Sequence, residues 1–255
     1  MTVLEALAVL TAGIGAGTIN VIVGSGTLIT FPVLLAVGLP PITANVSNTL
    51  GLVPGSVSGA VGYRRELVGQ RSRVLRFGTA SLLGGLTGAF LLIQLPSAAF
   101  DAIVPALICI ALVLVVLQPR LARAVAARRE RDGTEPSHYG GPLLTVGIGL
   151  CGIYGGYFGA AQGVLLLGMM GLALTEDIQR INAIKNVLAL IVNGVAAVVF
   201  LFVADFDWSA VGLLAVGAAI GGQIGAKIGR RLSPTVLRGV IVVVGLVAVA
   251  KLVLG

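Results

Sequence analysis

The sequence has little charge for its length. Of its 255 residues only 11% are Asp, Glu, Lys or Arg, whereas 57% are hydrophobic and the mean hydropathy is +1.05. Soluble domains carry about a quarter charged residues, because a small protein has more surface than apolar side chains can cover in water. This shortage excludes an ordinary soluble domain and predicts an all-α polytopic membrane protein of the cytoplasmic membrane.

Histidine, cysteine and aromatic residues are also scarce. The one histidine is His138, and the two cysteines, Cys109 and Cys151, lie in apolar segments without metal-ligand spacing. The chain has neither a hydrolase nucleophile elbow nor a phosphate-binding loop, so we expect no enzyme activity, no metal and no cofactor. The net charge of +7 comes with only 5% aromatic residues, and the arginines flank apolar runs. We therefore expect basic loops beside a lipid bilayer rather than nucleic-acid binding.

Apolar runs between the charges predict about eight full membrane spans. Two further apolar segments, 26–38 and 163–174, each follow a glycine-rich bend and are too short to span, so we predict broken or re-entrant helices there. The full spans are predicted near residues 4–23, 43–62, 77–95, 99–118, 141–160, 182–204, 208–228 and 234–254.

Basic loops set the predicted orientation. Residues 64–76 and 119–140 each carry five arginines, so both loops are predicted to be cytoplasmic. The turns near 101 and 205–207 carry aspartate without Lys or Arg and are predicted to face outward. We divide the chain into a first membrane repeat (1–118), a cytoplasmic basic linker (119–140) and a second membrane repeat (141–255). The linker is interpreted as a solvated tether, with a regulatory or partner site as the alternative.

The two halves repeat the same order of parts: a glycine-rich helix, a short segment, a helix with a polar stripe and a hairpin of apolar helices. Polar residues of the striped helices match at a constant offset of 137, and their spacing places each set on one helix face. Because the basic loops give the striped helices opposite directions, we predict inverted-topology repeats whose broken segments meet near the midplane. The matched residues are Asn45, Asn48, Thr49 and Ser56 in the first half and Asn182, Lys185, Asn186 and Asn193 in the second.

These motifs resemble the sulfite exporter TauE/SafE family, also called TSUP or DUF81, over nearly the whole chain. The resemblance implies a multi-span permease for sulfur-containing anions such as sulfite, thiosulfate or organosulfonates. The chain departs from the family in having Gly24-Ser25-Gly26 for three adjacent glycines, and Ala160-Ala161-Gln162 where glycines are common. The resemblance rests on Gly24-Ser25-Gly26-Thr27, Phe31-Pro32-Val33-Leu34-Leu35, Ala44-Asn45-Val46-Ser47-Asn48-Thr49, Gly155-Gly156-Tyr157-Phe158-Gly159 and Asn182 to Asn186.

Lys185 is the most informative residue of the stripes. A charge within the membrane is costly without a partner, and an anionic substrate would be that partner. The alternative is that Lys185 reaches the cytoplasmic headgroups beside Arg180. Amides and hydroxyls can donate to oxyanions without adding charge, although they also serve as contacts between helices. The predicted substrate-binding residues are Lys185, Asn182, Asn186, Asn193, Asn45, Asn48, Thr49, Ser25, Thr27 and Gln162.

We therefore predict a secondary transporter, an exporter of small sulfur-containing anions across the cytoplasmic membrane. The alternatives are an anion channel and a non-transporting membrane scaffold or assembly protein. Glycines recur every fourth residue at 217, 221, 225 and 229, and at 51, 55 and 59. This pattern lets helices approach closely, and we expect packing within one chain, with a homodimer contact as the alternative.

Overall fold

The computed structural model describes residues 1–132 and 140–228, together with residues 239, 242, 243 and 246. The predicted span 234–254 lies largely outside the described residues, as do His138 and Gly229. Within these limits all regular structure is helical and no strand is present. The helices are α1 (Val3–Ile22), α2 (Thr27–Ala36), α3 (Pro41–Gly62), α4 (Arg71–Gln94), α5 (Ser97–Asp132), α6 (Gly141–Tyr157), α7 (Gln162–Ala173), α8 (Ile178–Leu201) and α9 (Trp208–Ile228).

Five of these helices are long and apolar enough to cross a bilayer, namely α1, α4, the first part of α5 (Ser97–Leu117), α8 and α9. The short apolar helices α2 and α7 lie where the sequence predicts broken segments. The described residues are thus all-helical, as the sequence predicts, and their long apolar helices are those of a polytopic membrane protein.

Helix α5 is longer than the sequence analysis predicts. The predicted span ends at 118, but the helix continues to Asp132, so the first part of the predicted linker is helical. Residues 119–132 are rich in Ala and Arg, which are strong helix formers, whereas hydropathy detects only the apolar part of a helix. With 36 residues α5 extends over about 54 Å, well beyond the apolar thickness of a bilayer.

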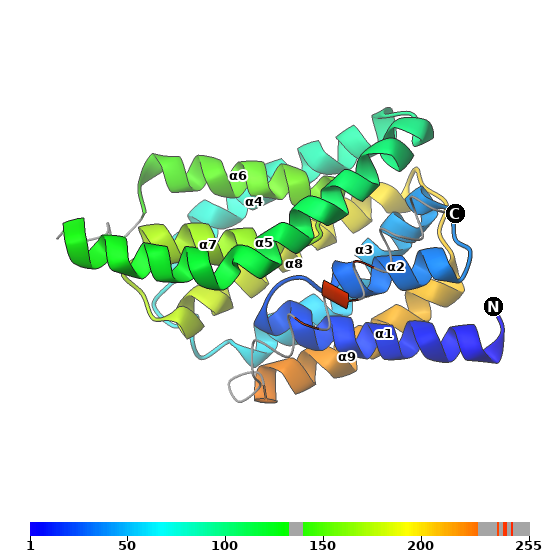
Figure 1. Cartoon of the computed structure of the whole chain (residues 1–255), viewed down its shortest axis with the longest axis horizontal. Helices are drawn as coiled ribbons and strands as arrows, with labels where there is room; N and C mark the ends of the chain where they lie inside the picture. Colours follow the sequence, from blue (N-terminus) through cyan, green and yellow to red (C-terminus); the bar gives the residue numbers. More distant parts are fainter. Residues whose placement is uncertain (133–139, 229–238, 240–241, 244–245, 247–255) are drawn as a thin grey trace.

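The helices pack as two bundles, and each bundle contains helices from both halves of the chain. Helix α9 packs along α1 and α3, and α4 packs along α6 and α8. In Figure 1, α1 and α9 lie along one edge of the molecule, and α4 and α6 lie along the opposite edge. Helices α3 and α8 meet between these edges. Each half therefore gives one helix, α4 or α9, to the bundle of the other half.

Glycines allow these helices to touch. A Cβ atom at Gly221 of α9 would lie 2.0 Å from the carbonyl oxygen of Ile14 in α1. A Cβ atom at Gly88 of α4 would lie 2.0 Å from the carbonyl oxygen of Ile153 in α6. Larger residues would push the backbones apart, so the expectation that the repeated glycines pack helices within one chain is confirmed.

Candidate functional site

Two helices are interrupted in the same way near the centre of the molecule. Helix α1 ends at Ile22 and α6 ends at Tyr157, and each is followed by a glycine in the left-handed region, Gly24 (φ 85°) and Gly159 (φ 76°). Each of these glycine N–H groups donates to a carbonyl five residues earlier, at 3.1 Å in both cases. The two bends thus end their helices by one local rule, with glycine where a side chain would be strained.

The two bends touch each other. The N–H of Gly163 donates to the carbonyl oxygen of Gly24 at 3.0 Å. A Cβ atom at Gly24 would lie 2.3 Å from the Cα of Gly163, and one at Gly163 would lie 2.4 Å from the Cα of Gly24. Only glycine backbones fit this crossing, which brings together the starts of α2 and α7.

The polar stripe of α8 is bound to the end of α1. The Lys185 ammonium donates to the carbonyl oxygens of Asn20 at 2.7 Å and Val21 at 3.0 Å. The Nδ2 groups of Asn182 and Asn186 donate to the same Val21 oxygen at 3.2 and 3.4 Å. Carbonyls at a helix end lack intrahelical donors and carry partial negative charge, which stabilises an ammonium.

The side chain of Lys185 is fully buried, at 0% exposed. Its ammonium contacts carbonyl oxygens, and it makes no ion pair with a carboxylate in the part of the chain that the structure describes. Because an ammonium has three N–H donors and two are used, one remains for a further acceptor.

The polar stripe of α3 is bound to both bends. The Nδ2 of Asn45 donates to the carbonyl oxygen of Tyr157, at the end of α6, at 3.0 Å. Asn48 donates from Nδ2 to Thr27 Oγ1 at 3.2 Å and accepts a hydrogen bond from the hydroxyl of Thr30. Each stripe therefore holds the interrupted helix of the opposite half. These contacts join side chains to backbone carbonyl oxygens, which every residue has, so the pattern of residue types could not predict them.

Thr49, Ser56 and Asn193 complete the two stripes. The hydroxyl of Thr49 donates within its own helix to the carbonyl oxygen of Asn45 at 2.9 Å. Asn193 is half-buried, and its Nδ2 lies 3.5 Å from Ser56 Oγ. These two residues stand 137 apart in the sequence, so matched members of the two stripes meet each other.

Several buried polar atoms around the bends have no hydrogen-bond partner. They include two donors, the hydroxyl of Ser25 and the Nε2 group of Gln162, and two acceptors, the Oδ1 atoms of Asn45 and Asn182. All four residues are at most 6% exposed. Buried polar groups normally find partners in protein, water or ligand, so unpaired donors on both bends indicate a place where a polar ligand binds.

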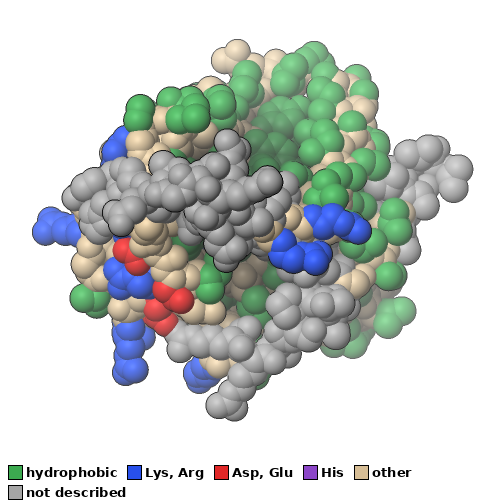
Figure 2. All heavy atoms as spheres, turned by 60° about the vertical axis from the view of Figure 1, so that its left-hand side comes forward, with side chains coloured by type: hydrophobic (Ala, Val, Ile, Leu, Met, Phe, Trp, Pro, Cys, Tyr) green, Lys and Arg blue, Asp and Glu red, His purple; other side chains and the backbone are tan. Residues whose placement is uncertain are grey.

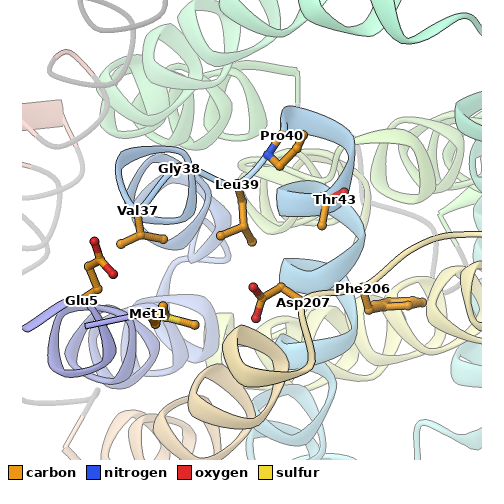
Figure 3. Close-up of a pocket in the computed structure, with 9 residues that line it drawn as sticks. All are labelled: Met1, Glu5, Val37, Gly38, Leu39, Pro40, Thr43, Phe206 and Asp207. Atoms are coloured by element: carbon orange, nitrogen blue, oxygen red, sulfur yellow. The ribbon is translucent and has the colours of Figure 1, made fainter. Parts of the chain in front are cut away.

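A separate cavity of about 370 Å³ lies away from the bends, where α1 and α9 begin and α2 ends (Figure 3). The carboxylates of Glu5 and Asp207 lie on its wall. Both side chains accept backbone N–H groups at the first turn of a helix. We call this region the acidic end; it contains none of the predicted substrate-binding residues.

The opposite end of the molecule is basic. Figure 2, which brings this end forward, shows Lys and Arg side chains spread over the face with few acidic ones. Here Arg73 and Arg180 bind Glu176 at 2.5 and 2.7 Å. Burial raises the pKa of Glu176, but the hydrogen bonds from both arginines outweigh it and hold the pKa below the ordinary value, so the carboxylate is ionised at neutral pH. We call this region, with Arg64, Arg65 and Lys227, the basic end.

The structure brings together nine of the ten predicted binding residues as buried side chains around the crossing bends, with Asn193 half-buried further along α8. It also adds the carbonyl oxygens of Asn20, Val21 and Tyr157, which sequence reasoning missed. A buried polar core at the crossing of two broken helices is an arrangement that recurs in membrane transporters.

The chain belongs to the sulfite exporter TauE/SafE family, whose model matches residues 9–252. It is 29% identical to the probable membrane transporter protein YfcA of Escherichia coli K12, over 93% of this chain and 85% of that protein. It is 30% identical to the probable membrane transporter protein ORF9 of Sinorhizobium sp, over 78% of this chain and 73% of the relative. A probable membrane transporter protein of Haemophilus influenzae is 25% identical, over 94% of this chain and 91% of its own length. No solved structure matches the chain. It is a multi-pass transporter of the cell membrane.

Proposed function

We propose that the protein is a secondary transporter that exports small sulfur-containing anions, with its substrate site at the crossing of the two bends. The observation that carries this proposal is the buried Lys185 ammonium, which donates to two carbonyl oxygens and has a third N–H donor for a further acceptor. The proposed binding residues are Lys185, Asn182, Asn186, Asn193, Asn45, Asn48, Thr49, Ser25, Thr27 and Gln162.

Energetics favour an anion at this place. A lysine held within a membrane costs several kcal/mol, and carbonyl dipoles compensate only part of a full charge. A sulfite or sulfonate group would supply the opposite charge and accept from Lys185, Ser25 and Gln162 together. Most backbone N–H groups in the first turns of α2 and α7 already donate to carbonyl oxygens, so the side-chain donors would carry the site.

We infer that the two halves are inverted repeats, with the site on their pseudo-two-fold axis. The reciprocal contacts of α9 with α1 and of α4 with α6 support this arrangement, as does the contact between the matched residues Ser56 and Asn193. With the basic end in the cytoplasm, α3 runs inward and α8 runs outward.

The charges at the two ends of the molecule support export. A cavity of about 470 Å³ at the basic end is lined by Arg64, Arg65 and Lys227 together with one carboxylate, Glu66, and this excess of positive charge would raise the local concentration of a cytoplasmic anion. The cavity at the acidic end presents Glu5 and Asp207, which would repel a released anion.

The test is counterflow of labelled sulfite, thiosulfate, taurine and sulfoacetate in proteoliposomes, with wild type, Lys185→Met and Lys227→Met. Met keeps the length and apolar bulk of lysine, so we expect Lys185→Met to lose about tenfold or more in transport of at least one of these anions. Lys227→Met removes an exposed lysine of the basic end, where water screens its charge, so it should lower transport much less than Lys185→Met does and serves as the comparison.

Equal transport by wild type and Lys185→Met would remove the lysine from the site. Flux without counterflow would identify an anion channel, and absence of any flux from folded protein would favour a scaffold.

A further inference from the structure

Tyr63 is buried at the basic end of the polar core. It is the residue that follows α3, and its side chain is only 1% exposed. It packs in one cluster with Val21 of the α1 end and Ala183 of α8. The Val21 carbonyl oxygen holds Lys185, and Ala183 lies between Asn182 and Lys185 in the sequence. The tyrosine side chain therefore packs with residues next to the carbonyl oxygens and side chains of the polar core.

A small cavity beside Tyr63 reaches the stripe at Asn182. It has a volume of about 70 Å³ and is lined by Tyr63, Gln179 and Asn182, together with Ile22, Leu167 and Ile178. Such a space holds only a few water molecules. Asn182 is the first stripe residue reached from this cavity, and Lys185 lies about one helical turn deeper.

The loop that begins with Tyr63 is pinned to α8. Both terminal nitrogens of Arg180 donate to the carbonyl oxygen of Val68, at 3.2 and 3.3 Å. The buried Gln70 returns a hydrogen bond from Nε2 to the carbonyl oxygen of Arg180 at 3.1 Å. Loop 63–70 and the first turn of α8 thus hold each other through three hydrogen bonds, two residues before Asn182.

Glu176 fixes the arginine of this contact. Its carboxylate binds Arg180 Nε at 2.7 Å and Arg73 at 2.5 Å. Arg73 is 2% exposed and also donates to Gln70 Oε1 at 3.2 Å. Because the carboxylate is ionised at neutral pH, the cluster keeps Arg180 directed at Val68.

We propose that Tyr63 is the cytoplasmic gate of the substrate pathway, and that Arg180, anchored by Glu176, is the latch that holds loop 63–70 and the ring in the closed position. Outward movement of the ring would join the small cavity to the space around Lys185. The proposal rests on the proposed function for the identity of the anion that passes, but the closure itself is measured without transport.

The test is accessibility of a single cysteine at 186, one helical turn deeper than Asn182 and 4% exposed. In a background with Cys109→Ala and Cys151→Ala, Asn186→Cys is treated with the anionic, membrane-impermeant reagent MTSES in inside-out and right-side-out vesicles. Labelling follows the population of the open gate, so adding Tyr63→Ala should raise the rate from the cytoplasmic side about tenfold or more. Arg180→Gln should raise it in the same direction, and Tyr63→Phe should keep it slow.

Val61→Ala is the matched control, because Val61 lies two residues before Tyr63, on the last turn of α3, but is 49% exposed. It should leave the labelling rate unchanged. The gate would be overturned if the single-cysteine protein and its folded Tyr63→Ala and Arg180→Gln variants were all labelled at the same rate. If Tyr63→Ala does not fold, Tyr63→Leu and Arg180→Gln give the same comparison. If the wild-type protein carries no anion flux but the gate variants are labelled faster, the proposed function is refuted and the gate is retained.

Discussion

The side chain of Gln162 offers a way to separate substrate binding from helix packing. Its Nε2 group is buried and has no hydrogen bond to lose in the substrate-free protein. Gln162→Met keeps length while removing the donor, so we expect the half-saturating anion concentration to rise about tenfold or more. The thermal midpoint should change little, because an apolar group replaces an unpaired polar one. Vesicle flux and thermal unfolding in detergent measure the two quantities.

Asn48→Ala is the comparison for this prediction. The Asn48 amide bonds to Thr27 and Thr30 and so fixes the start of α2 on α3. Its loss should lower the thermal midpoint clearly. Unchanged affinity in Gln162→Met, with normal flux, would place Gln162 outside the site.

At the level of residues the sequence predicted which polar side chains would share a helix face. It did not predict which of their atoms would lack a hydrogen-bond partner. The spacing of Asn182, Lys185 and Asn186 gave the stripe, and all three are buried in the structure. Their partners are backbone carbonyl oxygens of Asn20 and Val21, which every residue type possesses. Only the fold brings those oxygens to α8, so residue types carried no signal for them.

The crossing of the bends depends on Gly163 at the start of α7. A Cβ there would lie 2.4 Å from Gly24 Cα and 2.9 Å from Lys185 Cδ, so the bends would have to separate. We expect Gly163→Ala to destabilise the protein by about 1–3 kcal/mol and to abolish transport, since overpacking shifts backbone at the site. Thermal unfolding and counterflow measure these effects.

Gly168→Ala provides the matched control on the same helix. No atom lies within 4 Å of a Cβ placed at Gly168, and alanine favours helix over glycine. This variant should be as stable as wild type or more so, with transport retained. Identical behaviour of Gly163→Ala and Gly168→Ala would contradict the described contact between the bends.

At the level of elements, apolar length and glycine bends predicted α2 and α7 well, because both signals are local in the sequence. The same method ended α5 at 118, since it measures affinity for lipid and not helix propensity. The helix to Asp132 depends on Ala, Leu and Arg in a segment too charged to be counted as a span.

At the scale of the whole molecule, the matched order of parts predicted two repeats. It did not predict that α4 packs on helices of the second half and α9 on helices of the first. The glycines of α9 show why. Gly221 faces α1 and Gly222 faces α3, so this helix has small residues toward two neighbours of the other half. Glycine spacing predicts close packing without identifying the partner, and the partner follows only from the three-dimensional arrangement.

The distribution of charge predicts how transport should respond to a membrane potential. Among the residues that the structure describes, the buried charged side chains are Arg73 at the basic end and Lys185 at the site. No buried carboxylate is present in this part of the chain to carry a coupling proton. With the inside negative, exporting one net negative charge then gains about 2.3 kcal/mol per 100 mV, an outward bias of roughly fiftyfold.

A potassium diffusion potential in proteoliposomes with valinomycin tests this response. For vesicles containing protein in one orientation, the outside-to-inside ratio of the transported anion should shift by about fiftyfold per 100 mV for each net negative charge that it carries, inside negative, and reverse when the gradient is reversed. Protein-free vesicles measure leakage of the anion through the lipid, and vesicles with Lys185→Met show how much of the response depends on the proposed site. A ratio that does not change with potential would show that a second ion moves with the anion and cancels its charge. Such coupling would then have to be sought at neutral groups such as Asn45 and Asn182, whose buried Oδ1 atoms can accept a cation.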